Sequence, residues 1–297
     1  MYKAENIKGK KSIRTEKIDR KSKAFPEKLR RIPNPPKQIY CTGDLSLLEK
    51  KSISVVGSRK FTLYGKNVAM MIGRRLGESG IPVVSGLANG IDGFAHEGVL
   101  EAGGKIIGVL GSGIEKMTPR RNRKLMMQGL EMGGLVVSEY EPGEEARPYT
   151  FPARNRIISA LGEILVIVEA NFNSGALITA QNAADQGKEI FVVPGNINSQ
   201  FSMGSNLLIR DGATPLIVID DLIREIGIVP PDIVSEERTF AEDEKTIIEE
   251  LKNLGSASID ILAEKTGKSP ASVGAILTIL EIKGVVVSVA GQIHLAK

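Results

Sequence analysis

Short apolar segments alternate with segments of helical spacing from residue 52 to about residue 228, and no other feature constrains the fold of this chain as strongly. The apolar segments lie at 52–56, 81–84, 105–110, 135–138, 164–169, 189–193 and 215–219. The helical segments lie at 64–78, 91–102, 121–132, 154–161 and 175–186. Short runs that are apolar throughout are typical of strands buried on both faces. We therefore predict an α/β fold: an extended Rossmann-like, doubly wound, mostly parallel sheet with helices on both faces.

The charge of the chain is unevenly distributed. Residues 1–40 carry 13 Lys and Arg against 4 Asp and Glu, whereas the whole chain sums to only +4, so the remainder is mildly acidic. We predict a basic, disordered tail over residues 1–24, which either stays solvated or touches nucleic acid. The proline-containing segment from Phe25 to Leu48 is predicted to be an extended lead-in over the surface of a Rossmann-like domain that spans 25–228.

A second, smaller domain is expected at the carboxyl end. Residues 229–242 contain two prolines and four acidic residues against one Arg, which predicts an acidic linker. Helical spacing at 243–254, 258–266 and 270–282, followed by a hairpin pattern, resembles a winged-helix domain over 243–297. The third helix carries almost no positive charge at its start, so a structural or protein-binding role stands beside DNA binding as an open alternative.

A glycine turn, Gly57-Ser58-Arg59, follows the first apolar run and precedes a helical pattern. This order places backbone N–H groups and the positive end of a helix dipole where an anion can approach closely. Arg59 adds a fork of donors at the same place. We predict a phosphate site here, with a tight turn that binds no ligand as the alternative.

The nucleotide-binding fingerprints with established spacing are missing. The loop of nucleoside triphosphatases requires Gly-x4-Gly-Lys-Ser/Thr, and seven residues separate Gly57 from Gly65-Lys66. The dinucleotide fingerprint has its nearest candidate at Gly111-Ser112-Gly113, where Lys116 stands in place of the third glycine. Hydrolysis of this type and dinucleotide binding are therefore not expected.

Two further loops combine small polar residues with helix starts. Ser85 and Gly86 follow an apolar run and precede Asp92 and His96, which are four residues apart and can meet on one helix face. We expect Asp92 to order this loop, with His96 as its partner, in preference to acid–base catalysis. The sequence Ser174-Gly175 opens another helix after an apolar run and is a second possible phosphate cradle.

An aromatic residue with three polar neighbours precedes the helix at 154–161. Phe151 can stack a base, while Arg154, Asn155 and Arg156 can hold phosphates, which is the chemistry of single-strand binding. A salt-bridged helix start would account equally well for this cluster.

Residue counts exclude several classes of protein. Cys41 is the one cysteine, so no intramolecular disulfide can form, and a reducing cytoplasm is expected. Since His96 and His294 are the only histidines, no zinc site is expected, and no metal or cofactor is predicted. No apolar run reaches transmembrane length, so no membrane association is expected.

Five ordered motifs resemble those of DNA-processing protein A, the DprA or Smf family. They are Val56-Gly57-Ser58-Arg59, Ser85 to Asp92, Phe151 to Ile158, Ser174 to Ala180, and Pro194-Gly195 with Gly204-Ser205-Asn206. The resemblance covers roughly residues 25–297. It implies a cytoplasmic protein with no catalytic step, which binds single-stranded DNA, forms a homodimer and loads the recombinase RecA onto incoming DNA during natural transformation.

The resemblance also implies positions for the contacts. The phosphate pocket would comprise Gly57, Ser58, Arg59, Ser85, Gly86, Arg154, Asn155, Arg156, Ser174 and Gly175, with Phe151 as the base-stacking platform. The dimer contact would lie near Leu207, Leu208, Ile209 and Leu216. The alternative is a nucleotide-handling enzyme of the lysine-decarboxylase-like group, whose Pro-Gly-Gly-x-Gly-Thr motif is broken here at Pro194-Gly195-Asn196.

Overall fold

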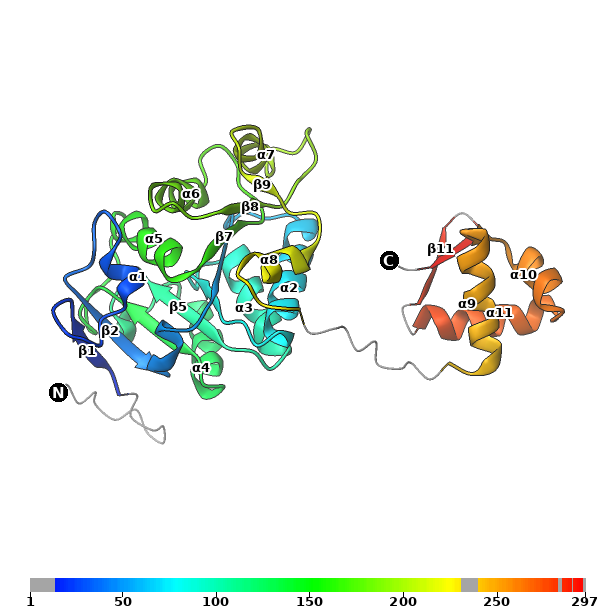
Figure 1. Ribbon diagram of the computed structural model, residues 1–297, viewed down its shortest axis with the longest axis horizontal. Coiled ribbons are helices and arrows are strands. Elements are labelled where there is room, and N and C mark those ends of the chain that lie inside the picture. Colours follow the sequence, from blue (N-terminus) through cyan, green and yellow to red (C-terminus); the bar gives the residue numbers. More distant parts are fainter. Residues whose placement is uncertain (1–13, 231–239, 283–284, 290, 296–297) are drawn as a thin grey trace. The chain divides into compact units, whose positions relative to one another are not determined.

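The computed structural model describes residues 14–230, 240–282, 285–289 and 291–295 (Figure 1). Two compact units divide the chain, one ending at Pro230 and the other beginning at Pro231. Each unit has its own hydrophobic core. No helix within the described ranges is both long and apolar enough to span a bilayer.

The first unit is built on one sheet, which has nine strands within the described residues. In chain order they are β1 (Glu16–Asp19), β2 (Gln38–Gly43), β3 (Ile53–Val56), β4 (Val83–Ser85), β5 (Ile106–Leu110), β6 (Leu135–Ser138), β7 (Ile164–Ile167), β8 (Ile190–Val192) and β9 (Thr214–Pro215). Across the sheet the order is β1-β2-β6-β5-β4-β3-β7-β8-β9. The seven strands from β3 onward pair in parallel, whereas β2 pairs antiparallel with β1 and β6. The predicted α/β fold with a mostly parallel sheet is confirmed.

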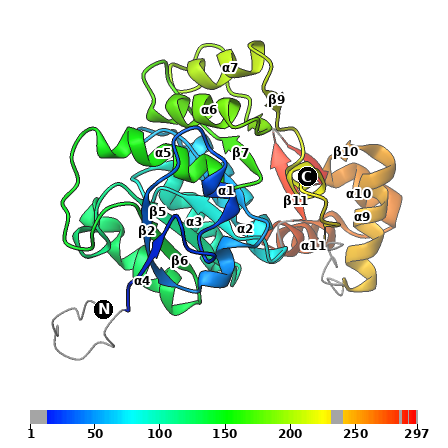
Figure 2. The same cartoon turned by 60° about the vertical axis from the view of Figure 1, so that its left-hand side comes forward.

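Helices cover both faces of this sheet (Figure 2). In chain order they are α1 (Glu27–Arg30), α2 (Leu63–Glu78), α3 (Ile91–Glu101), α4 (Arg123–Glu131), α5 (Thr150–Leu161), α6 (Gly175–Asp185), α7 (Met203–Arg210) and α8 (Ile219–Glu225). Side chains of α2, α3, α4 and α8 share one core with the sheet, and those of α1, α5, α6 and α7 share the other. Along β7, Ile164 and Val166 face the first core while Leu165 and Ile167 face the second, as the two-residue repeat of a strand requires.

The strand order has a reversal point between β3 and β7. From β3 the chain adds β4, β5 and β6 on one side, and then returns to add β7, β8 and β9 on the other. β3 and β7 are direct neighbours, with Val56 paired to Ile167 at their carboxyl ends. Ligands of open parallel sheets bind in the crevice outside such ends at the reversal point. A ligand site is therefore expected at the loops after β3 and β7.

The amino-terminal region differs from the prediction. The expected disordered tail over 1–24 is wrong for residues 14–24, because β1 pairs with β2 and buries Ile18. The remainder of that tail, 1–13, lies outside the described residues. The expected extended lead-in also contains α1 and β2, and β2 lies inside the sheet between β1 and β6. A single buried residue in an edge strand leaves too weak a two-residue pattern to be recognised from sequence.

The region after β8 also differs from the prediction. The apolar run at 215–219 forms a strand only at Thr214–Pro215, and α8 begins at Ile219. Within the run Leu216 is buried in the core, whereas Ile217 is 76% exposed. Helices α7 and α8 were not predicted.

The second unit has the elements predicted for a winged-helix domain. They are α9 (Glu242–Leu254), β10 (Ser256–Ala257), α10 (Ile259–Thr266), α11 (Pro270–Ile282), β11 (Val286–Val289) and β12 (Gln292–Leu295). The hairpin of β11 and β12 is extended by β10, a short strand that was not predicted. Most of the predicted acidic linker, residues 231–239, lies outside the described residues. Helix α11 contains no Lys or Arg.

Candidate nucleic-acid interface

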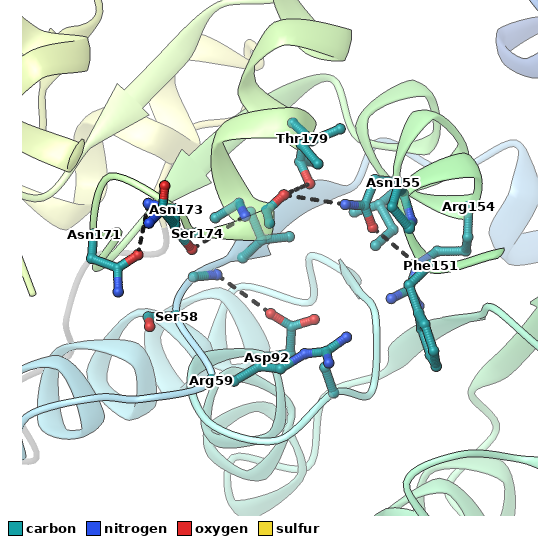
Figure 3. Close-up of a pocket in the computed structure, with 18 of the residues that line it drawn as sticks. Ser58, Arg59, Asp92, Phe151, Arg154, Asn155, Asn171, Asn173, Ser174 and Thr179 are labelled. Carbon is teal, nitrogen blue, oxygen red and sulfur yellow. Dashed lines mark hydrogen bonds between the residues drawn. The ribbon is translucent and has the colours of Figure 1, made fainter. Parts of the chain in front are cut away.

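A cavity of about 520 Å³ opens at the reversal point of the sheet, and we name it the switch-point pocket (Figure 3). The loops after β3 and β7 and the start of α5 form its walls. Eight of the predicted residues line it: Gly57, Ser58, Arg59, Phe151, Arg154, Asn155, Ser174 and Gly175. Lys60, Asn171, Asn173 and Thr179 line it as well and were not predicted. The structure thus brings together residues that lie more than a hundred positions apart in the sequence.

The backbone of the glycine turn is already occupied by groups of the protein itself. The N–H of Gly57 donates to the Asp92 carboxylate at 3.4 Å, and the N–H of Ser58 donates to the backbone carbonyl of Glu169 at 2.7 Å. At the start of α2, the N–H and hydroxyl of Thr62 donate to the Glu169 carboxylate at 3.0 and 2.5 Å. The anion at this helix start is therefore a carboxylate of the chain. Phosphate binding at this turn would depend on side chains, which differs from the backbone cradle that the sequence suggested.

Asp92 and Arg154 are buried, opposite charges that lie close to Gly86, and their hydrogen bonds join three loops. Asp92 accepts the N–H of Gly86 at 3.0 Å in addition to that of Gly57, which confirms its predicted loop-ordering role. Arg154 is 3% exposed and donates to the carbonyls of Gly86, at 2.9 Å, and of Val109. These contacts connect α5 to the ends of β4 and β5. The guanidinium of Arg154 therefore holds this part of the pocket wall in position.

Burial shifts the pKa values of both Asp92 and Arg154. It raises the pKa of Asp92, against the opposing effect of the Arg154 charge. It lowers the pKa of Arg154 to about 10, against the opposing effect of Asp92, so Arg154 remains protonated at neutral pH. Since both oxygens of Asp92 accept amide hydrogens, these contacts favour its ionised form.

Three predicted residues do not line the pocket. The hydroxyl of Ser85 is buried and donates to the carbonyl of Val55 at 2.6 Å. Gly86 lies behind the pocket, where a Cβ would come within 2.6 Å of the Asp92 carboxylate. Nη2 of Arg156 donates to both carboxylate oxygens of Glu139, each at 2.8 Å, so Arg156 is in a salt bridge, as the alternative interpretation of this cluster expected. A DNA contact by any of the three stays a prediction, without support from the pocket geometry.

His96 is not the partner of Asp92. Its Nε2 lies 3.2 Å from the carbonyl of Val83, and its side chain is fully buried in α3. Burial lowers the pKa of His96 to about 4, so the ring is neutral at physiological pH. The expected pairing was wrong because α3 directs Asp92 toward the glycine turn and His96 toward the sheet.

Two exposed cations lie at the mouth of the switch-point pocket. Arg59 and Lys60 are both exposed, and the guanidinium of Arg59 lies over the ring of Phe151, 5.1 Å from its centroid. This cation–π contact orients Arg59 on the pocket wall. It also covers one face of the predicted stacking platform, so a base can use that face only by displacing the guanidinium.

The start of α6 supplies polar groups on the opposite side. Ser174 caps this helix, accepting the N–H of Ala176 at 3.3 Å. No atom lies within 4 Å of the position of a Cβ on Gly175, so the backbone is open there. The side chain of Asn155 donates to the carbonyl of Gly175 at 3.2 Å and joins α5 to α6. Hydrogen-bonding groups therefore face the cations across the pocket.

A basic segment beside the pocket was missed in the sequence. Within residues 116–124 there are five cations and no acidic residue, and all five are exposed. They are Lys116, Arg120, Arg121, Arg123 and Lys124. The side chain of Asn122 anchors this segment by donating to the carbonyls of Leu87 and Ala88 at 3.0 and 2.8 Å, and Ala88 lines the pocket. The local charge run was the available signal.

The predicted dimer residues differ in accessibility. Leu216 is 8% exposed and belongs to the core of its own chain. Leu208 and Ile209 are partly buried and pack against the second core, while Leu207 is half-buried on the same helix, α7. Met203 at the start of α7 is 38% exposed, and Ile217, after β9, is 76% exposed. Dimerisation itself stays a prediction.

No group of three or more His, Cys, Asp or Glu side chains within the described residues is arranged to hold a metal ion. The chemistry available in the switch-point pocket is therefore that of cations, amides and hydroxyls around a cavity, with an aromatic ring at one wall.

Comparison with known proteins identifies relatives over most of the chain. Residues 16–227 match the family model of DNA recombination-mediator protein A, and residues 235–292 match that of the DprA winged helix domain. The chain is 34% identical to Protein Smf of Escherichia coli over 278 residues, covering 91% of this chain and 74% of that protein. It is 37% identical to the DNA processing protein DprA of Bacillus subtilis over 206 residues, covering 69% of each.

Two solved structures are similar in fold. The DNA processing protein A of Streptococcus pneumoniae matches with a TM-score of 0.66 and 36% identity, over 71% of this chain and 74% of that one. The DNA processing protein A of Helicobacter pylori, whose structure is described for its single-stranded DNA binding mode, matches with a TM-score of 0.64 and 28% identity. That match covers 72% of this chain and 96% of the H. pylori chain.

The fold and the matched segments define a protein with a Rossmann-like sheet unit followed by a winged-helix unit. The chain belongs to the DprA/Smf family of DNA recombination-mediator proteins.

Proposed function

We propose that this chain is a cytoplasmic single-stranded-DNA-binding protein that passes the bound strand to the recombinase RecA during natural transformation and recombination. The observation that carries the proposal is the switch-point pocket, with Arg59 and Lys60 exposed at its mouth and polar groups of α5 and α6 opposite them. A groove of cations and amides beside an aromatic ring suits a sugar–phosphate backbone with unpaired bases. The single-strand binding of the H. pylori relative supports the same assignment.

We assign the DNA contacts to polar residues that line the switch-point pocket. Arg59 and Lys60 take phosphates by charge, and Ser58, Asn155, Asn171 and the start of α6 at Ser174 and Gly175 add neutral hydrogen bonds. The exposed basic segment 116–124 continues this surface away from the pocket and would bind further phosphates of a longer strand.

Arg154 receives a different role in this proposal. It donates to the carbonyls of Gly86 and Val109, and its buried charge offsets that of Asp92, so we assign it to holding the pocket wall in place. Phe151 orients Arg59, and bases would stack on the outer plane of that guanidinium.

Family membership supports a recombinase as the proposed partner. A recombination mediator delivers a single strand to a recombinase, which supports RecA as the partner. For the homodimer we propose a contact that includes Met203, Leu207 and the exposed Ile217, in place of the buried Leu216. An enzyme of the lysine-decarboxylase-like group is not proposed, because the chain belongs to a family of mediators.

The test is a charge reversal at the pocket mouth. Arg59→Glu is expected to weaken binding of an oligothymidylate by about 2 kcal/mol or more, roughly 30-fold, because a charge-assisted contact is lost and repulsion is added. Arg74→Glu, the same reversal on an exposed arginine of α2 outside the pocket, is the matched control and should change the affinity little. Equal effects of the two reversals would show that only overall charge matters, and the pocket assignment would be wrong.

A further inference from the structure

A second cavity, of about 490 Å³, lies beside the switch-point pocket, and we name it the Tyr64 pocket. Its lining includes Thr62, Tyr64, Glu169, Asn196, Ser199 and Ser202. Lys60 lines the first cavity, and Thr62, two positions further along the same loop, lines the second. Two residues span at most about 7 Å, so a strand of several nucleotides can reach both cavities.

The side chain of Tyr64 forms an aromatic wall of this cavity. Its hydroxyl donates to the carbonyl of Pro194 at 3.0 Å, which links α2 to the loop after β8 and fixes the direction of the ring. Tyr64 is nevertheless 50% exposed. Among the described residues no aromatic ring or cation stacks on it, whereas Arg59 covers the ring of Phe151. The ring of Tyr64 is therefore held in place and open to a ligand.

The charged group in the lining is Glu169, and its hydrogen bonds are made within the chain. Glu169 is 1% exposed, and its two oxygens accept the N–H and the hydroxyl of Thr62 at 3.0 and 2.5 Å. Among the described residues that line the Tyr64 pocket there is no Lys or Arg, so a phosphate would find no cation here and would meet the negative charge of Glu169. An uncharged group is therefore the ligand that suits this cavity.

The remaining polar side chains of the cavity can each donate or accept a hydrogen bond. Ser202 is 3% exposed, and its hydroxyl has no hydrogen-bond partner in the part of the chain that the structure describes. The hydroxyl of Ser199 accepts the N–H of Phe201 at 3.3 Å and can still donate its own hydrogen. The exposed Asn196 carries an amide with two donors and one acceptor oxygen. Such groups can bond to the polar edge of any of the four bases.

We propose that the Tyr64 pocket holds one base of the bound single strand, stacked on the ring of Tyr64 and accepted whatever its identity. Stacking on an aromatic side chain tolerates every base, because each base has a π face. The phosphates of this nucleotide stay outside the cavity, on the side of the exposed Lys60. The inference rests on the proposed function, and it adds to that function a second nucleotide site without base selectivity.

The first experiment uses the absence of tryptophan from the chain. Tyr64→Trp introduces one tryptophan at the proposed site, and a base that stacks on it should quench its fluorescence when a long oligothymidylate binds. Met71→Trp is the matched control, because Met71 is 54% exposed on the same helix and lines neither cavity. Its emission should stay unchanged. Equal quenching in both variants, or no quenching in a Tyr64→Trp variant that binds the oligomer, would overturn the stacking assignment.

The same titration tests whether the site accepts every base. Oligomers of thymidylate, deoxyadenylate and deoxycytidylate should each quench the Tyr64→Trp variant, because the stacking surface and the ambivalent polar groups suit all of them. Quenching by one of the three oligomers alone would overturn the base tolerance.

The second experiment compares Tyr64→Ala with Tyr64→Phe over oligothymidylates of increasing length. Tyr64→Ala should lower the affinity about tenfold for oligomers long enough to fill both cavities, and should leave the affinity for the shortest oligomers, which the switch-point pocket alone can hold, unchanged. Tyr64→Phe keeps the ring and should bind like the wild type at every length. A loss of the same size at all lengths, or equal losses in the two variants, would indicate a structural effect and overturn the assignment.

Comparison with Arg59→Glu in the same assays separates this inference from the proposed function. If the wild-type chain binds a long oligothymidylate and Arg59→Glu weakens that binding, while Tyr64→Ala binds normally and Tyr64→Trp is not quenched, the Tyr64 pocket alone is rejected. If the wild-type chain binds no oligothymidylate of any length, the proposed function is rejected, and the Tyr64 pocket is rejected with it as a nucleotide site.

Discussion

Replacing Arg154 by methionine tests whether this arginine supports the pocket wall or contacts DNA. The substitution removes hydrogen bonds to the buried carbonyls of Gly86 and Val109 and leaves the buried carboxylate of Asp92 without its counter-charge. An unsatisfied buried acceptor costs about 1–3 kcal/mol, and leaving a buried charge uncompensated costs about 3–5 kcal/mol in total. We therefore expect Arg154→Met to lower the free energy of unfolding of the first unit by about 3–5 kcal/mol.

A double-mutant cycle with Asp92→Asn completes this test. If the two side chains act as a pair, the double variant should lose about 1–3 kcal/mol less than the sum of the two single variants. Urea unfolding followed by circular dichroism measures these values, with separate transitions fitted for the two units. If the free energy of unfolding of Arg154→Met changes by less than about 1 kcal/mol while single-strand binding is lost, the structural role is wrong and Arg154 is a DNA contact.

Three further predictions concern pH, assembly and domain roles. Burial lowers the pKa of His96 to about 4 in the folded state, so between pH 6.5 and 4 the unfolded chain binds more protons, and the free energy of unfolding should fall by up to about 3 kcal/mol as the pH falls. His96→Gln should remove this part of the pH dependence of urea unfolding, and an unchanged profile would contradict the buried neutral ring. Ile217→Asp should convert a dimer to monomer in sedimentation while leaving the fold intact, whereas Leu216→Asp should unfold the first unit; a dimeric Ile217→Asp variant would reject the proposed contact. A chain ending at Pro230 should stay folded and keep its single-strand affinity within about tenfold in anisotropy, and loss of binding would assign DNA recognition to the winged-helix unit.

The central strands of the sheet were predictable, because the residues of each buried strand are themselves apolar. The runs that became β5 and β7 are apolar throughout, and their place at the centre of a sheet covered on both faces follows directly. β1 was not predictable on these grounds, since Ile18 is its one buried residue and its partner strand lies about twenty positions away. Pairing between segments, unlike burial, leaves little trace in either segment alone.

The candidate site was predictable in position and less so in chemistry. Gly57 and Ser174 follow strands that end at the same edge of the sheet, so their convergence follows from parallel topology. The occupation of the glycine turn by Asp92 and Glu169 was not predictable, because both carboxylates come from other segments and only the fold brings them to those amides. The same holds for Arg156, whose pairing with Glu139 depends on how α5 packs against the end of β6.

The most direct test of single-strand binding is fluorescence anisotropy of the wild-type chain with one labelled oligonucleotide, presented as a single strand and as its duplex over a series of salt concentrations. We predict tighter binding of the single strand, with log Kobs falling linearly against log salt at a slope of about −0.7 for each phosphate neutralised. Arg59, Lys60 and the basic segment 116–124 supply enough cations for several such contacts. Weak binding that is equal for the single strand and the duplex, or affinity that does not change with salt, would contradict the account.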